Sequence, residues 1–180
     1  EDFCIYLQLK TIADIGIVGL PNAGKSSLLA SITSARPKIA NYKFTTINPN
    51  LGVAKYDNKE VTLADIPGLI ENAHNGVGLG IKFLKHIERC KTLLHLIDAN
   101  ELNLEKSYRQ VRKELGKYSK KLLDKEEIIV FNKIDLLKEE EINEKKKKFT
   151  SKLKKDIFMI STLDKKLLSK FKSKIIKYVS

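Results

Sequence analysis

A phosphate-binding loop pattern, Gly-x4-Gly-Lys-Ser, occupies residues 19–26 and constrains the fold of this chain more than any other feature. It stands between an apolar run at 12–18 and the amphipathic start of a helix at 27–32, the setting that such a loop requires. Glycines let successive backbone N–H groups surround an anion, and the helix points its positive end at the same place. The pattern therefore predicts a nucleoside triphosphate site at Gly19, Leu20, Pro21, Asn22, Ala23, Gly24, Lys25, Ser26 and Ser27.

Within that loop, two side chains have distinct expected roles. Lys25 is placed to reach the outer phosphates, and the hydroxyl of Ser26 is placed to ligate magnesium.

Apolar runs typical of strands recur along the chain, at 12–18, 51–55, 61–64, 92–97, 128–131 and 157–160. Helical periodicity lies between or after them, at 79–87, 104–122 and 167–179. This alternation predicts an α/β P-loop NTPase fold, with a six-stranded, mostly parallel sheet and helices on both faces. A short polar link at 56–59 predicts one antiparallel hairpin. Ligands of such sheets bind at the carboxyl ends of the strands.

One loop expected at that edge follows the third predicted strand and consists of Asp65, Ile66, Pro67 and Gly68. An Asp at a strand end near a phosphate-binding loop can hold magnesium through a water molecule. The glycine N–H can then contact the terminal phosphate and respond to its loss.

A second loop, Asn132-Lys133-Ile134-Asp135, follows the fifth predicted strand. The carboxylate of Asp135 can accept hydrogen bonds from N1–H and N2–H of guanine together, a pair of donors that adenine lacks. Ser161, Thr162 and Leu163, after the sixth strand, are placed to offer a backbone N–H to guanine O6. The alternative interpretation of Asn-Lys-x-Asp is a helix-capping turn.

The long loop at 36–47 contains two adjacent threonines. Loops of this length are usually functional. Either Thr45 or Thr46 could give its hydroxyl to magnesium and its N–H to the terminal phosphate, and spacing does not choose between them.

Together these motifs resemble the translation-factor-like GTPases and, within them, the Obg family. The resemblance rests on residues 19–26, 42–50 and 65–90 and covers about 7–179. It implies a Ras-like, GTP-binding Obg-type G domain at 11–180, preceded by a leader at 1–10 that exits a glycine-rich N-terminal domain missing here. It also implies slow, magnesium-dependent GTP hydrolysis in the cytoplasm, in assembly of the large ribosomal subunit.

The resemblance also implies residue roles. It favours Ser26 and Thr46, rather than Thr45, as magnesium ligands, and assigns catalytic roles to Lys25, Thr46, Asp65 and Gly68. The nucleotide contacts that it implies in the long loop are Phe44, Thr45, Thr46, Ile47 and Asn48.

Two further residues bear on the rate of hydrolysis. Leu69 stands where many related GTPases carry a Gln that orients the attacking water, so slow hydrolysis is expected. In GTPases resembling this one, an asparagine at the position of Asn22 coordinates potassium beside the phosphates. The alternative is that Asn22 merely tolerates the turn geometry after Pro21.

Charge leaves the macromolecular partner open. The net charge is +12, and almost all of the positive charge is lysine, which is consistent with RNA contact or with coding bias. The charge run at 138–154 favours a solvated helix over an RNA-binding patch. No apolar stretch reaches transmembrane length, and two cysteines without metal spacing indicate reduced thiols. His95, in a strand pattern, is interpreted as structural.

Three functions therefore compete. The first is a GTP-hydrolysing switch, a monomer that binds GTP or GDP and meets the large ribosomal subunit through the full-length protein. The second is a nucleotide-gated RNA- or protein-binding module in which hydrolysis is secondary. The third is an Obg-like ATPase, although those proteins depart from the Asn-Lys-x-Asp sequence that this chain retains.

Overall fold

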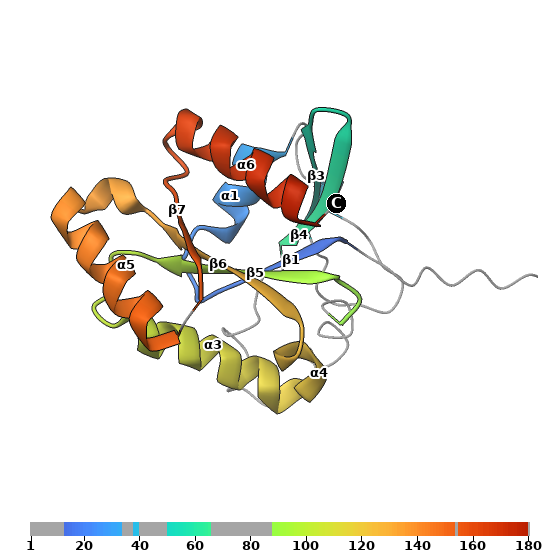
Figure 1. Ribbon diagram of the computed structural model, residues 1–180. Coiled ribbons are helices and arrows are strands. Elements are labelled where there is room, and N and C mark those ends of the chain that lie inside the picture. Colours follow the sequence, from blue (N-terminus) through green and yellow to red (C-terminus); the bar gives the residue numbers. More distant parts are fainter. Residues whose placement is uncertain (1–12, 34–37, 40–49, 66–87, 154, 180) are drawn as a thin grey trace, which may run out of the picture.

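The computed structural model describes residues 13–33, 38–39, 50–65, 88–153 and 155–179 (Figure 1). Its seven strands form one sheet in the order β2-β3-β4-β1-β5-β6-β7. The strands are β1 (Ile15–Val18), β2 (Lys38–Ile39), β3 (Asn50–Tyr56), β4 (Lys59–Asp65), β5 (Thr92–Asp98), β6 (Glu126–Asn132) and β7 (Ile157–Met159).

The sheet is mostly parallel. β1 pairs in parallel with β4 and β5, and β6 pairs in parallel with β5 and β7. β3 and β4 form the predicted antiparallel hairpin, in which Asp57 takes a left-handed backbone conformation in the tight turn. The edge strand β2 adds to the six predicted strands, and its two residues are too few to carry a detectable pattern.

Helices cover both faces of this sheet (Figure 1). The helices are α1 (Lys25–Ile32), α3 (Leu104–Tyr118), α4 (Lys120–Leu123), the 3-10 turn η2 (Ile134–Leu136), α5 (Glu139–Leu153) and α6 (Lys165–Val179). α1 and α6 pack on one face, where Leu28, Phe171 and Ile175 join one core cluster. α3 and α5 lie on the other face, with Tyr108 and Phe149 in edge-to-face contact. Because both faces are covered, all four residues of β1 are buried.

The helix expected at 104–122 is interrupted. α3 ends at Tyr118, and Ser119 is extended before the short α4 begins. The chain then turns back along α3, so that a Cβ on Gly116 would lie only 2.9 Å from the side chain of Leu123. Leu122 is therefore buried by a chain reversal and not by a longer helix. The helix expected at 79–87 and the leader at 1–10 lie outside the described residues.

Among the helices that the structure describes, none combines the length and the apolar character needed to cross a bilayer. Cys90 is a buried thiol, and burial raises its pKa to about 12. Cys4 lies outside the described residues.

Candidate nucleotide-binding site

The phosphate-binding loop joins β1 to α1 at the carboxyl ends of the parallel strands, as the sequence predicts. Two of its glycines are required by close approach. A Cβ on Gly19 would lie 2.3 Å from the Leu96 carbonyl oxygen, because the loop crosses directly over β5. Gly24 has a φ of 94°, and a Cβ there would meet the Asn132 amide at 2.4 Å. A side chain at either position would displace the loop.

Asn132 connects the two predicted nucleotide motifs. Its Nδ2 donates a hydrogen bond of 2.9 Å to the Ala23 carbonyl, across 109 residues of sequence. The side chain is fully buried, and Asn132 Oδ1 has no partner among the described residues. The helix-capping alternative does not describe this residue, because its amide holds the phosphate-binding loop against the end of β6.

The rest of that turn is held open toward solvent. Lys133 has a φ of 64°, and its ammonium group lies 2.7 Å from the Asp98 carboxylate at the end of β5. Ile134 N–H donates to the Ile160 carbonyl at 3.3 Å, which ties the turn to the loop after β7. Asp135 is exposed at this edge of the sheet, so its carboxylate is accessible to a ligand.

The loop after β7 lies beside this turn and is braced internally. Ser161 is buried, and its hydroxyl accepts a hydrogen bond of 3.1 Å from Leu163 N–H. The Leu163 side chain is 80% exposed, and Thr162 is half-buried. The structure thus brings Ser161, Thr162 and Leu163 to the same edge as Asp135.

At the other end of the site, Ser26 meets Asp65. The Ser26 hydroxyl donates a hydrogen bond of 2.5 Å to Asp65 Oδ2, which joins the start of α1 to the end of β4. Asp65 is fully buried, and its Oδ1 has no partner within the part of the chain that the structure describes. A hydroxyl oxygen beside an under-satisfied carboxylate is a donor set that suits a hard divalent cation such as Mg²⁺.

Lys25 folds over the phosphate-binding loop. Its ammonium group donates to the carbonyl oxygens of Gly19 at 3.2 Å and Leu20 at 3.1 Å. The positive charge therefore lies over the loop that backbone N–H groups are expected to line. Next to it, Asn22 has a φ of 62°, a left-handed conformation that asparagine adopts more readily than most residues.

Several predicted site residues lie outside the described ranges. They are Phe44, Thr45, Thr46, Ile47, Asn48, Ile66, Pro67 and Gly68, together with Leu69.

Asp98 lies at the candidate site and is absent from the residues that the motifs predict. It ends β5 at the ligand edge and pairs with Lys133, and its carboxylate also accepts from Asn100 N–H at 2.9 Å. Its position directly after the apolar run at 92–97 could have identified it, because the other motifs also follow strand ends at this edge.

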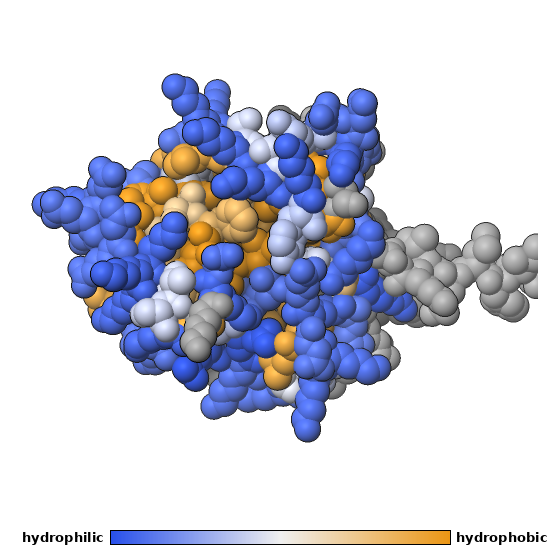
Figure 2. All heavy atoms as spheres, in the orientation of Figure 1, coloured by the Kyte–Doolittle hydropathy of each residue, from blue (hydrophilic) through white to orange (hydrophobic). Residues whose placement is uncertain are grey.

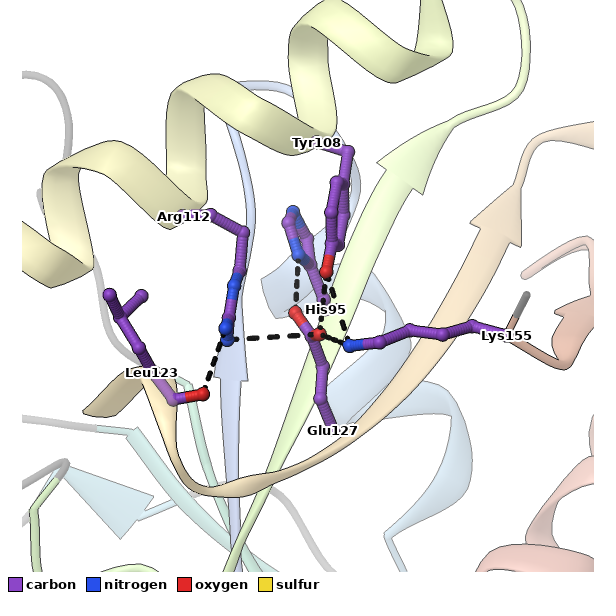
Figure 3. Close-up of polar contacts among 6 residues, drawn as sticks. All are labelled: His95, Tyr108, Arg112, Leu123, Glu127 and Lys155. Carbon is purple, nitrogen blue, oxygen red and sulfur yellow. Dashed lines mark hydrogen bonds and ion pairs between the residues drawn. The ribbon is translucent and has the colours of Figure 1, made fainter. Parts of the chain in front are cut away.

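A buried ionic cluster joins residues of β5, β6 and α3 with Lys155 (Figure 3). Glu127 Oε1 is 3.0 Å from His95 Nδ1, and Glu127 Oε2 accepts from the Tyr108 hydroxyl at 2.9 Å and from Lys155 at 2.6 Å. Arg112 approaches the same carboxylate at 3.8 Å. His95 pairs in register with Val18, the last residue before the phosphate-binding loop. These contacts agree with the interpretation of His95 as structural.

Burial and pairing set the protonation of this cluster. Burial lowers the pKa of His95 because it disfavours the charged imidazolium, so the ring is neutral near pH 7. Burial also raises the pKa of Glu127. Hydrogen bonds from His95 and Lys155, together with the charge of Arg112, outweigh that effect and lower it to about 2. Glu127 is therefore a buried carboxylate that stays ionised.

The fold and this edge of the sheet define a P-loop nucleotide-binding domain. A family model described as 50S ribosome-binding GTPase matches residues 14–133.

Two curated relatives are both named GTPase Obg. That of Pelagibacter ubique is 68% identical over 180 residues, which is 100% of this chain and 55% of the relative. That of Ehrlichia chaffeensis is 57% identical over 164 residues, 91% of this chain and 48% of the relative. The chain therefore belongs to the 50S ribosome-binding GTPases and, among them, to the Obg family. It spans about half the length of these relatives.

Solved structures agree with the P-loop GTPase fold. Aquifex aeolicus Era bound to GDP.AlF4- superposes with a TM-score of 0.71 at 25% identity, covering 94% of this chain and 57% of that one. Era in complex with MgGDPNP and nucleotides of 16S ribosomal RNA has a TM-score of 0.66 at 28% identity, covering 91% and 55%. The G domain of T. maritima FeoB, at 22% identity and a TM-score of 0.66, covers 92% and 98% and shows the shared fold alone.

Proposed function

We propose that this domain binds GTP and GDP with magnesium and hydrolyses GTP slowly, as a switch in cytoplasmic assembly of the large ribosomal subunit. The observation that carries the nucleotide part is the hydrogen bond between Asn132 Nδ2 and the Ala23 carbonyl. It joins a base-reading turn to a phosphate-binding loop, so one ligand can occupy both. The family membership supports GTP hydrolysis, and the family description supports the ribosomal role.

Guanine selection is assigned to the turn at Asn132–Asp135. Lys133 is anchored by Asp98, and Asp135 is exposed beside it, which suits bidentate acceptance from guanine N1–H and N2–H. Backbone N–H groups at Ser161, Thr162 or Leu163 are proposed to meet guanine O6. A site that matches these donors rejects a base that lacks them, because the bound base would cover the Asp135 carboxylate without supplying donors to it.

Phosphate binding and magnesium are assigned to the other end of the site. Ser26 Oγ and Thr46 are proposed as direct ligands of Mg²⁺, Asp65 is proposed to hold the ion through a water molecule, and Gly68 N–H is proposed to contact the terminal phosphate. When bound, the ion neutralises charge that develops on the phosphoryl oxygens. Lys25 exchanges its two carbonyl partners for the outer phosphates, since a phosphate is the stronger acceptor for an ammonium group. In the Era complex with MgGDPNP the ligand is of this same chemical class.

Slow hydrolysis follows from Leu69, an apolar residue where a water-orienting group is expected. Potassium at Asn22 remains part of the proposal, although the left-handed backbone by itself accounts for asparagine there. Turnover measured in potassium and in sodium at equal ionic strength tests this part. Equal rates would remove potassium from the mechanism.

Calorimetric titration with GTP, GDP and ATP in the presence of Mg²⁺ tests the proposed ligand. We expect GTP and GDP to bind at least about 10³-fold more tightly than ATP. The variant Asp135→Asn should lose most of that preference, whereas Asp164→Asn, in the next loop of the same edge, should keep it. ATP binding as tight as GTP binding would overturn the guanine assignment and favour an ATPase.

Single-turnover hydrolysis with and without large ribosomal particles tests the proposed role. We expect the particles to accelerate the reaction. Binding to the particles without any acceleration would favour the nucleotide-gated binding module.

A further inference from the structure

The outward face of α6 carries positive charge without any acidic residue. The helix holds six lysines and neither Asp nor Glu: Lys165, Lys166, Lys170, Lys172, Lys174 and Lys177. Its opposite face is apolar and packs into the core, through Leu168, Phe171, Ile175 and Ile176. The helix is therefore held firmly on the domain while its charged face is turned to solvent.

The lysines form a continuous stripe. At 100° per residue, Lys166, Lys170, Lys174 and Lys177 fall within about 80° of arc. They span about 17 Å along the helix axis. All four are exposed, and Ser169 and Ser173 lie on the same side of the helix. Figure 2 shows hydrophilic side chains standing along α6 at the top of the molecule. We call Lys166, Lys170, Lys174 and Lys177 the α6 stripe.

The ion pairs that the structure describes leave the charge of the α6 stripe in place. Among the described residues, no ion pair involves any lysine of α6. Lys174 and Lys177 lie 5.8 and 5.7 Å from the ring centroids of Phe158 and Tyr56. Such contacts with aromatic rings position an ammonium group but leave its charge in place.

Two acidic residues close to the ends of α6 have other hydrogen-bond partners. Asp164 accepts from the backbone N–H groups of Lys166 and Leu167, which caps the start of the helix. Glu126 accepts from the Tyr178 hydroxyl at 2.8 Å.

α5 provides the contrast, because it has the same length and a similar number of lysines. Its five lysines are offset by four glutamates in the same 15 residues, a net charge of +1 against +6 for α6. Two of those lysines are also used internally. Lys145 donates to the carbonyls of Ala99 and Glu101, and Lys152 pairs with Glu105 at 2.6 Å. α5 is thus the solvated helix that its sequence predicts, whereas α6 is a surface of one charge sign.

We propose that the α6 stripe binds the phosphate backbone of RNA. Lysine is depleted from protein–protein interfaces, and single-sign lysine surfaces suit a polyanion. Because α6 has no arginine, each contact places a single ammonium charge on a phosphate, and none of them recognises a base through paired hydrogen bonds. This inference rests on the proposed ribosomal role and deepens it by naming the surface that meets RNA.

The test compares two triple variants of this chain that remove equal charge. One is K166Q/K170Q/K174Q in the α6 stripe. The other is K146Q/K147Q/K148Q on α5, where all three lysines are exposed. The probe is a fluorescein-labelled RNA hairpin of about 20 base pairs, titrated by anisotropy between 50 and 200 mM KCl. GTP affinity and the thermal unfolding midpoint show that each variant is folded.

For the unaltered chain we expect affinity to fall about 100-fold between 50 and 200 mM KCl, as for about four phosphate contacts. The α6 variant should bind the RNA at least about 10-fold more weakly. The slope of log affinity against log salt concentration, about four for the unaltered chain, should fall by about two to three. The α5 variant should stay within about 3-fold. An equal loss of RNA affinity in both variants, or no loss in either, would overturn the assignment to α6.

Poly-glutamate competing as well as RNA at equal charge would instead identify an acidic protein as the partner and would also overturn the proposal. Failure of RNA binding with normal GTP binding and turnover rejects the α6 stripe alone. Failure of GTP binding, with RNA binding intact, rejects the nucleotide assignment alone.

Discussion

Two carboxylates of this domain are almost completely buried, and their surroundings are opposite. Glu127, with a side chain 2% exposed, has both oxygens engaged, by His95, Tyr108 and Lys155 (Figure 3). Asp65, at 0% exposed, has one oxygen bonded to a serine hydroxyl and the other without a partner among the described residues. A buried charge that is fully paired has no bonding capacity left for a ligand, whereas one that is left under-satisfied keeps it.

The difference also follows position in the sheet. Asp65 ends β4, at the edge where ligands of parallel sheets bind, and Glu127 is the second residue of β6, at the opposite end of its strand. We therefore expect substitutions at Asp65 to reduce activity while leaving stability nearly unchanged. Substitutions at Glu127 should do the reverse.

The largest expected effect is on hydrolysis in Asp65→Asn. We expect single-turnover GTP hydrolysis to fall about 10³-fold, because the carboxylate charge beside Ser26 is lost where magnesium is proposed. The free energy of unfolding should change by less than about 1 kcal/mol, since the amide oxygen can still accept from the Ser26 hydroxyl. Ser31→Ala, on the same helix as Ser26, is the control and should hydrolyse GTP normally. A large loss of stability without loss of activity would break the comparison.

Glu127→Gln should destabilise the domain by about 3 kcal/mol, because it leaves Lys155 and Arg112 without their buried counter-charge. Urea unfolding followed by circular dichroism measures this change. GTP affinity of the folded protein should stay within about 3-fold. Glu126→Gln, one residue earlier and exposed, is the matched control. A Glu127 variant as stable as the control would show that the cluster contributes little.

Acid should destabilise the domain in two stages. The folded-state pKa of His95 and that of Glu127 both lie below their ordinary values, so the unfolded chain takes up more protons as the pH falls. Stability should decrease first below about pH 6.5 through His95. It should decrease again from the ordinary Glu pKa of 4.5 toward the folded value of about 2, by about 3 kcal/mol through Glu127.

Urea midpoints measured from pH 7 to pH 3 check this expectation. The second stage should be absent from Glu127→Gln. Its persistence there would assign the acid sensitivity to other carboxylates.

The smallest expected effect is at Asn132. This residue sharpens the comparison between Asp65 and Glu127, because it supports the structure and also lies at the candidate site. Asn132→Ala removes the hydrogen bond to Ala23 and should cost about 2 kcal/mol of stability. GTP affinity should fall about 10-fold through the displaced loop. Thermal unfolding and calorimetry of one preparation measure both losses. Loss of stability with unchanged GTP affinity would show that the loop keeps its position without this bond.

Much of the fold could be predicted from local pattern. β5 and β6 contain the apolar runs at 92–97 and 128–131, and the phosphate-binding loop carries its own strand and helix context. The break between α3 and α4 could not, because the helical spacing continues through Leu122 while Ser119 turns the chain back. The two-residue strand β2 likewise depends on pairing with β3 and on no pattern of its own.

The sequence by itself determined the chemistry of the site: glycines, Lys25 and Ser26 in one loop, Asp65 at a strand end, and Asn132 with Asp135 in one turn. Only the tertiary structure decided which of these groups meet. The strand order places β1 between β4 and β5, so Ser26 reaches Asp65 across 39 residues and Asn132 reaches Ala23 across 109. It also decided which buried charge is structural, since Glu127 has its partners on β5, on α3 and at Lys155 between α5 and β7. Residue types are local information, whereas partners depend on how the sheet is assembled.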